Sequence, residues 1–187
     1  TRTNSGRMIQ RTVGGHFWSI SLTYNLLTKA QFNPINAFLI QNKGSLTPFF
    51  VELPQYKAPQ DSTFATYVAG GGTPKLLDLG ANTNAGIDNV IMSESSYVVN
   101  THKTPLPGDI FTISDAGDSN HKKAYMVTRV ETNTDYFTGA QPTTNQIRVH
   151  FTPGLVKATT AATTKFVFHK PKIRVINKTN KQNHTLN

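Results

Sequence analysis

The sequence predicts a mainly β fold, a β-barrel or sandwich of about ten short strands with one helix packed on a sheet. Apolar and polar residues alternate in several short runs, and turn-forming residues recur at intervals of roughly ten residues. Thr, Asn, Ser and Gly are abundant, which favours strands and turns over helices. The 187 residues fit one domain, and 11 Phe and 6 Tyr supply much of the area that it can bury.

The first expected strand covers residues 16–24. Trp18, Ile20, Leu22 and Tyr24 occupy every second position, so they share one face of an extended chain. Two glycines directly before this run mark a turn or bulge. The alternation therefore predicts a half-buried strand.

A helix is expected next, and two starts fit the sequence. Thr28 can be the N-cap, with Gln31 completing a capping box. Asn33 is the alternative N-cap, because it would place Pro34 at the first helical position, which proline favours. Either start gives a helix over Pro34 and onward to about Asn42.

The expected helix ends before Gly44, a residue type that commonly follows a helix. Ile35, Phe38 and Leu39 lie at i, i+3 and i+4 and form one apolar stripe. We expect this stripe to lie against the sheet face that carries Trp18.

The middle of the chain shows weaker patterns. Residues 46–53 read as extended, and residues 54–75 as a long, irregular connection that ends in the glycine run 70–72. This run does not fit a phosphate-binding P-loop, because Pro74 blocks the helix that must follow. Short apolar runs within residues 76–100 are expected to be brief strands, including one at residues 97–99.

The C-terminal half shows clearer strand signals. Residues 110–113 and 122–131 are expected to form a hairpin around the turn cluster at 115–120. Further strands are expected at residues 147–151, 166–169 and 173–176. The prediction is a single β-rich domain over residues 1–187, with 54–105 an insertion or irregular region and 178–187 a frayed tail. The chain begins at Thr1 without Met, which leaves open a preceding segment.

The residue types do not indicate an enzyme. There is no cysteine, hence no disulfide and no thiolate metal site, and none of the six histidines shows the helical spacing of zinc proteases. Asp115, Asp118 and Asn120 could meet calcium, but they lack the EF-hand spacing, no Glu closes the loop, and turn chemistry explains them better. We expect no catalytic activity and no cofactor. No run of about 18 apolar residues occurs, so no membrane-spanning helix is expected.

Charge is distributed unevenly along the chain. The 19 basic and 10 acidic residues give a net charge of +9. Residues 1–50 contain no acid, residues 51–120 are acidic on balance, and residues 121–187 are strongly basic. Two basic ends around an acidic middle fit a nucleic-acid binder, a subunit whose basic face meets an acidic neighbour, or a merely soluble surface.

Several motifs, taken in order, resemble tail proteins of tailed bacteriophages. They are RTNSGR at residues 2–7, Gly14-Gly15 before the Trp18 strand, FNPINAFL at residues 32–39 and an extended aromatic run to Pro54. Residues 107–111, 123–127 and 147–155 are also similar. The likeness covers residues 2–53, 107–131 and 145–155, and is weak from 54 to 105.

This resemblance implies a β-rich structural protein of the distal tail or baseplate, in the hub or the wedge. Such a protein works by contact rather than catalysis. Its partners would be other tail or baseplate proteins in a multi-copy ring or wedge, with no membrane involved. Its location would be the virion tail, after assembly in the cytoplasm of the bacterial host.

For this role we expect the basic ends to lie at contacts between subunits. The expected interface residues are Arg2, Arg7, Arg11, Lys170, Lys172 and Arg174. The first alternative is a nucleic-acid-binding β-barrel, which needs several exposed aromatic residues beside lysines. Its candidates are Phe17, Tyr24, Tyr125 and Phe168. The second alternative is a carbohydrate-binding module for host surface glycans, for which Trp18 would have to be exposed.

Overall fold

The computed structural model describes residues 19–21, 23 and 25–178. Six of its strands are β2 (Leu77–Leu79), β3 (Asn89–Ser93), β4 (Ile110–Asp115), β5 (Tyr125–Glu131), β6 (Gln146–Thr152) and β7 (Thr164–Val167). These strands form a closed antiparallel barrel in the order β2-β3-β6-β5-β4-β7. The predicted mainly β architecture is therefore confirmed, and the barrel is the form that it takes.

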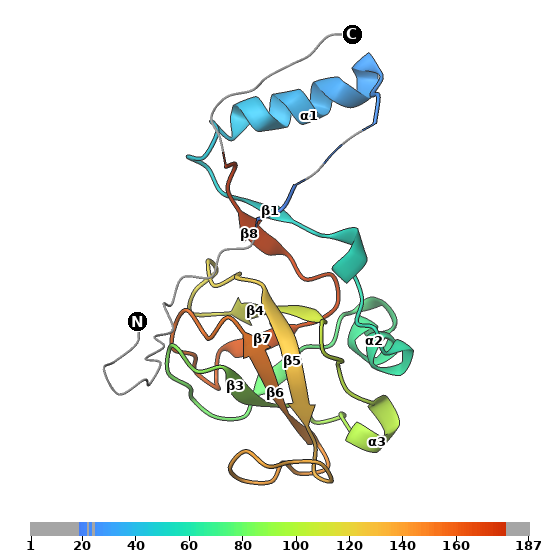
Figure 1. Ribbon diagram of the computed structural model, residues 1–187, viewed down its shortest axis with the longest axis vertical. Helices are drawn as coiled ribbons and strands as arrows, with labels where there is room; N and C mark the ends of the chain where they lie inside the picture. Colours follow the sequence, from blue (N-terminus) through green and yellow to red (C-terminus); the bar gives the residue numbers. More distant parts are fainter. Residues whose placement is uncertain (1–18, 22, 24, 179–187) are drawn as a thin grey trace, which may run out of the picture.

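The remaining elements lie outside the barrel wall (Figure 1). They are the strands β1 (Phe49–Val51) and β8 (Ile173–Val175), the helices α1 (Lys29–Gln41), α2 (Ser62–Ala69) and α3 (Val99–His102), and the 3₁₀ turns η1 (Pro54–Tyr56) and η2 (Gly70–Gly72). Strands β1 and β8 pair antiparallel as a separate two-stranded sheet.

The described residues contain eight strands, so the expected number of about ten is wrong for this part of the chain. Residues 19–21 and 23, from the strand expected at 16–24, form no strand, and the rest of that run lies outside the described residues. The strand expected at 97–99 is also wrong, because Val99 begins α3. The Val98 amide donates to Nδ1 of His102 at 2.9 Å, which stabilises this helical turn.

The barrel interior is filled by aromatic and branched side chains from all six strands. Phe111 is fully buried and its ring lies 5.2–5.6 Å from those of Tyr125, Phe151, Phe166 and Phe168. An irregularity between Val127 and Arg129 interrupts the alternation in β5, where β5 pairs with β6. Such a bulge strengthens the local twist that a small barrel needs.

The hairpin predicted from residues 110–131 is confirmed, although its strands pair only at Ile110–Met126 and Phe111–Tyr125. Beyond Phe111, β4 pairs with β7 instead, from Thr112 to Asp115. Strand β4 thus pairs with both β5 and β7, which are far apart in sequence, and this pairing closes the barrel.

The irregular connection expected at residues 54–75 contains a buried helix. The Asp61 carboxylate caps α2 by accepting from the Phe64 amide at 2.8 Å, and Gly70 ends it in the left-handed conformation. Phe64, Tyr67 and Val68 are buried, and the Phe64 ring lies 5.3 Å from Phe168. This stretch therefore adds to the barrel core.

Candidate assembly interface

Helix α1 and the two-stranded sheet extend away from the barrel as one arm (Figure 1). We define the arm as residues 25–51 together with residues 173–178. The first of the two expected helix starts is the observed one, because α1 begins after Thr28. The Thr28 amide donates to Oε1 of Gln31 at 3.0 Å, which is half of the expected capping box. Pro34 lies inside the helix, although it has no amide to donate there.

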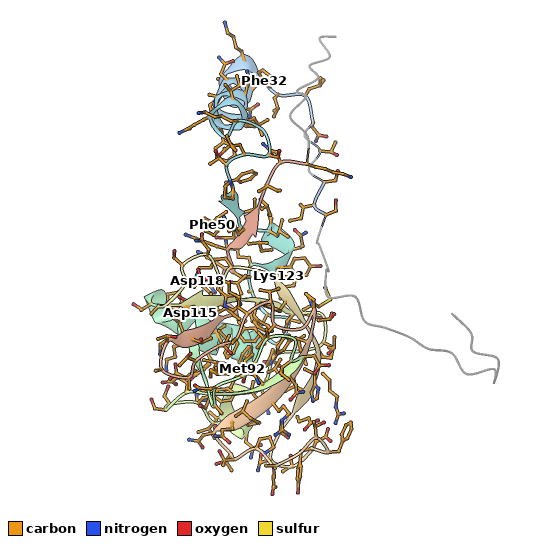
Figure 2. The ribbon with its side chains drawn as sticks, turned by 90° about the vertical axis from the view of Figure 1, so that its left-hand side faces the viewer. Phe32, Phe50, Met92, Asp115, Asp118 and Lys123 are labelled. Atoms are coloured by element: carbon orange, nitrogen blue, oxygen red, sulfur yellow. The ribbon has the colours of Figure 1, made fainter. Side chains whose placement is uncertain are left out.

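Helix α1 has no fully buried side chain, and Ile35 and Leu39 of its apolar stripe are half-buried. Its ring contact with the sheet is made by Phe38, which packs edge-on against Phe49 at 5.1 Å. Leu26, Ile40 and Leu46 are 96%, 59% and 74% exposed. Trp18, against which the stripe was expected to lie, is outside the described residues. Figure 2 shows how far Phe32 on α1 lies from Met92 in the barrel.

The base of the arm is attached to the barrel by a second apolar cluster. Its buried members are Leu53, Ile110, Ala124 and Ile173, and Ile20, Val51, Tyr56, Met126 and Val175 pack against them. Ile110 and Met126 belong to β4 and β5, so the cluster covers the outside of these barrel strands. The base is thus part of the folded body, whereas α1 is not.

Three of the six expected interface residues come together on β8 and the segment before it. Lys170, Lys172 and Arg174 are exposed, whereas Pro171 and Ile173 between them are buried. We call these three cations the basic face. Arg2, Arg7 and Arg11 lie outside the described residues, so their positions stay predictions.

Two further lysines adjoin the basic face. The Lys170 amide donates to the carbonyl of Lys57 at 2.8 Å, and the Arg174 amide to that of Lys122 at 3.2 Å. Burial lowers the pKa of Lys122, nearby Asp115 opposes this, and the charge on Lys172 adds to it. The surface beside the basic face is therefore also positive.

Most of the ten acidic side chains are engaged within the molecule. The seven engaged acids are Asp61, Asp78, Glu94, Asp109, Asp115, Asp118 and Glu131. Glu52 and Asp135 have no such contact, and Asp88 accepts only from its neighbour Asn89. Most carboxylates of the acidic middle of the chain therefore have partners elsewhere in the molecule, and none forms an ion pair with the basic face.

Glu131 is the centre of an ionic cluster on the outside of the barrel that sequence reasoning missed. Its fully buried carboxylate accepts from His150 at 2.9 Å, from Arg148 at 3.2 Å and from the Thr138 amide at 3.2 Å. Arg129 lies 3.4 Å away. Burial alone raises the pKa of Glu131, but the bonds from Thr138 and His150 outweigh it and lower the pKa to about 2. The cluster holds the loop 132–145 on the barrel.

A signal for this cluster was present in the sequence. Arg129 and Glu131 are two residues apart on one strand, as are Arg148 and His150 on another. Pairing of β5 with β6 places Arg129 opposite His150 and Glu131 opposite Arg148. Recognising the cluster from the sequence alone required knowing that these two strands pair.

A second polar cluster lies beside α2, and two of its members, Tyr67 and Lys75, also line a hollow of about 610 Å³. Tyr67 and Ser96 donate to one oxygen of Glu94, and Lys75 donates to Oγ of Ser96 at 2.6 Å. Burial alone raises the pKa of Glu94, but hydrogen bonds from Ser96, Tyr67 and Ser95 lower it to about 2. Such a carboxylate is a weak base, so Ser96 gains no activation as a nucleophile from it. The cluster ties α2 to the segment after β3.

The residues considered for calcium are used in turn contacts. Asp115 accepts from the Gly117 amide at 2.8 Å, and Asp118 from the Asn120 amide at 2.9 Å. Asp118 also forms an ion pair with Lys157. Across the described residues, no group of three or more His, Asp or Glu side chains is placed to hold a metal ion. In the same residues no helix has the length and apolar character to cross a bilayer.

The residues expected for the alternative functions are either buried in the barrel core or lie outside the described residues. Tyr125 and Phe168 belong to the barrel core, whereas Phe17, Trp18 and Tyr24 lie outside the described residues. Phe137, on the loop 132–145, is 72% exposed, with the Arg129 guanidinium 3.4 Å from its ring centre.

No protein-family model matches the sequence, and no curated protein is found to be similar to it.

Proposed function

We propose that the chain is a structural subunit of a bacteriophage tail, in the distal tail or baseplate, that acts through protein–protein contacts. The observation that carries the proposal is the arm. It presents a folded helix with no buried side chain, whereas the barrel beside it encloses its own hydrophobic core. The ordered motifs of residues 2–53 add the association with phage tails.

The arm has the properties of a contact element. Apolar side chains on an exposed helix cost solubility unless a partner covers them. An amphipathic helix is commonly recognised when its apolar side enters a groove, and an exposed strand can be recognised by pairing at its edge. The arm offers both elements, α1 and the short strand β1, on one projection. Other tail subunits in a ring or wedge would supply the covering surfaces.

The test is to locate the protein on particles of the virus that encodes it. Gold-labelled antibodies against this chain should bind at the distal end of the tail in negatively stained particles. Label on the capsid alone, or absence of the chain from purified particles by mass spectrometry, would overturn the proposal. Reversing the charges of Arg7 and Arg11 together should weaken assembly, more at low salt than at high salt.

The nucleic-acid-binding barrel is the alternative with a clear test. Because Tyr125 and Phe168 are buried, two of its four aromatic candidates are not accessible to bases. Tight binding of single-stranded DNA that falls steeply with salt would favour it nevertheless. For the carbohydrate-binding alternative, Phe137 stacked on Arg129 is the most exposed aromatic side chain among the residues described here. Loss of glycan binding in Phe137→Ala would favour that function.

A further inference from the structure

A hollow of about 570 Å³ lies between the glycine turn after α2 and the segment leading into β8. It is lined by Glu52, Ala69, Gly71, Gly72, Pro74, His169, Lys170 and Lys172. These residues come from three separate parts of the chain. The hollow therefore exists only in the folded protein, where it is continuous with the basic face.

The lining residues leave cationic and polar groups without partners. Lys170 and Lys172 are exposed and make no ion pair with any of the chain's acidic side chains. Nδ1 of His169 is enclosed by protein, yet it has no hydrogen-bond partner. Because that nitrogen is buried, the groups open to a ligand are the two lysine ammonium groups.

The side of the hollow formed by Gly71 and Gly72 presents main chain without side chains. Gly71 and Gly72 have φ angles of +62° and +132°, and a Cβ atom at either position would meet nothing within 4 Å. A ligand can therefore approach the main chain there without meeting a side chain. Two lysines on one wall and exposed main chain on the other suit an elongated ligand that bears negative charge.

The charge pattern indicates what kind of ligand this is. A second copy of the chain offers few free carboxylates, because seven of its ten acids are engaged internally. A nucleic-acid backbone offers phosphates to the lysines but has no main-chain amide that could donate to Glu52 in the lining. A peptide combines carboxylates for the lysines with amide groups that can donate to Glu52.

We propose that this hollow binds an acidic segment of a different protein. Carboxylates of the segment pair with Lys170 and Lys172, and its main chain lies along Gly71 and Gly72. The identity of that protein as a neighbouring tail subunit rests on the proposed function, whereas the binding of an acidic peptide does not.

Binding of a fluorescent hexaglutamate peptide, measured by anisotropy at low salt, tests the proposal. In Lys170→Glu/Lys172→Glu the affinity should fall by about tenfold or more, because two attractive contacts become repulsive. Lys29→Glu/Lys43→Glu is the matched control, since it makes the same change in net charge on exposed arm lysines. Both pairs contain one lysine of positive φ, Lys170 at 48° and Lys43 at 49°. The control should stay within about twofold of the unchanged protein.

Equal losses in the two double variants would overturn the proposal, because they would show attraction to net charge alone. Tighter binding of oligo(dT) than of hexaglutamate, abolished by the same Lys170 and Lys172 changes, would overturn it in favour of nucleic acid. Circular dichroism of each variant shows whether it is folded.

A second readout reports position directly. In a ¹H–¹⁵N spectrum, hexaglutamate should shift the amide signals of Gly71 and Gly72 while leaving that of Gly139, on the far loop, in place. Absence of shifts at Gly71 and Gly72 would contradict the site. If the hollow fails this test while gold label still lies on the tail, the site is wrong and the proposed function stands. If the peptide binds as described and the tail carries no label, only the proposed function falls.

Discussion

Helices α1 and α2 come from neighbouring parts of the chain, yet α2 buries three of its eight residues and α1 buries none of its thirteen. Both begin with a polar N-cap, and both carry aromatic side chains. The difference lies in their surroundings. Phe64 of α2 meets Phe168 and Tyr97 of the barrel core, whereas Phe38 of α1 meets one ring of a two-stranded sheet.

The barrel and the arm differ in what their side chains do: those of the barrel stabilise the fold, whereas those of the arm are available for contact with other molecules. The barrel encloses its aromatic core and pairs the buried carboxylate of Glu131 within the chain. Within the described residues, the arm exposes apolar side chains such as Leu26, Ile40 and Leu46, and the adjoining basic face is exposed as well. Changes in the barrel should therefore alter the stability of the fold, and changes in the arm should alter association.

The largest expected effect is in the barrel core. Phe111→Ala removes a buried ring that packs against four other rings, and it should lower the free energy of unfolding by about 3–5 kcal/mol. The matched change in the arm, Phe38→Ala, should cost less than about 1 kcal/mol. Urea titration followed by circular dichroism measures both. Equal losses would show that the arm belongs to the same folding unit.

The next effect concerns the buried ionic cluster. Glu131→Gln leaves the charges of Arg148 and Arg129 uncompensated, and it should destabilise the protein by roughly 3 kcal/mol. Glu52→Gln is the control, because Glu52 has an exposed carboxylate outside this cluster and should change little. A destabilisation of Glu131→Gln no larger than that of Glu52→Gln would contradict the role of the cluster.

The same residue predicts a response to acid. The pKa of Glu131 in the folded protein, about 2, lies below its ordinary value of 4.5. Its contribution to stability is therefore full above pH 4.5 and is lost as the pH falls from 4.5 toward 2. Melting temperatures across this range should fall less steeply for Glu131→Gln than for the unchanged protein. Parallel pH profiles would contradict the assignment.

A smaller effect is expected from His121 near neutral pH. Burial lowers the pKa of His121 below 6.5, while Asp115 and Asp118 oppose the shift and Lys157 adds to it. The unfolded chain therefore takes up a proton more readily, and stability should decline as the pH falls below 6.5. In His121→Gln this part of the pH profile should be flat. If the stability of His121→Gln still declines over this pH range, another group is responsible for the decline.

Much of the fold follows from local patterns. Thr28 and Gln31 mark the start of α1, and the apolar run at residues 110–113 and the alternation at residues 147–151 correspond to barrel strands. The basic stretch 170–174 was recognisable as exposed cations because lysine and arginine alternate there with proline and isoleucine. In these cases the deciding interactions lie within a few residues.

The features that were not predicted depend on distant residues. Residues 19–21 and 23 form no strand, because alternation shows which side chains would share a face but not whether a neighbouring strand is there to pair. Helix α2 carries Asp61 and Gly70 as end signals, yet its short length gives little periodicity. The apolar stripe of α1 is compatible with burial in its own chain or in a partner. The hollow beside Lys170 and Lys172 exists only because β8 returns past the glycine turn.

The most direct test of the account is to remove apolar surface from the arm and measure both stability and incorporation into particles. Ile40→Ser/Leu46→Ser changes two exposed arm residues, and Ile87→Ser/Val156→Ser changes two exposed barrel residues as the control. The account predicts unchanged melting temperatures for both proteins and loss from purified tails of the arm variant alone. Normal incorporation of the arm variant, or a large fall in its melting temperature, would contradict the claim that the arm serves contact rather than folding.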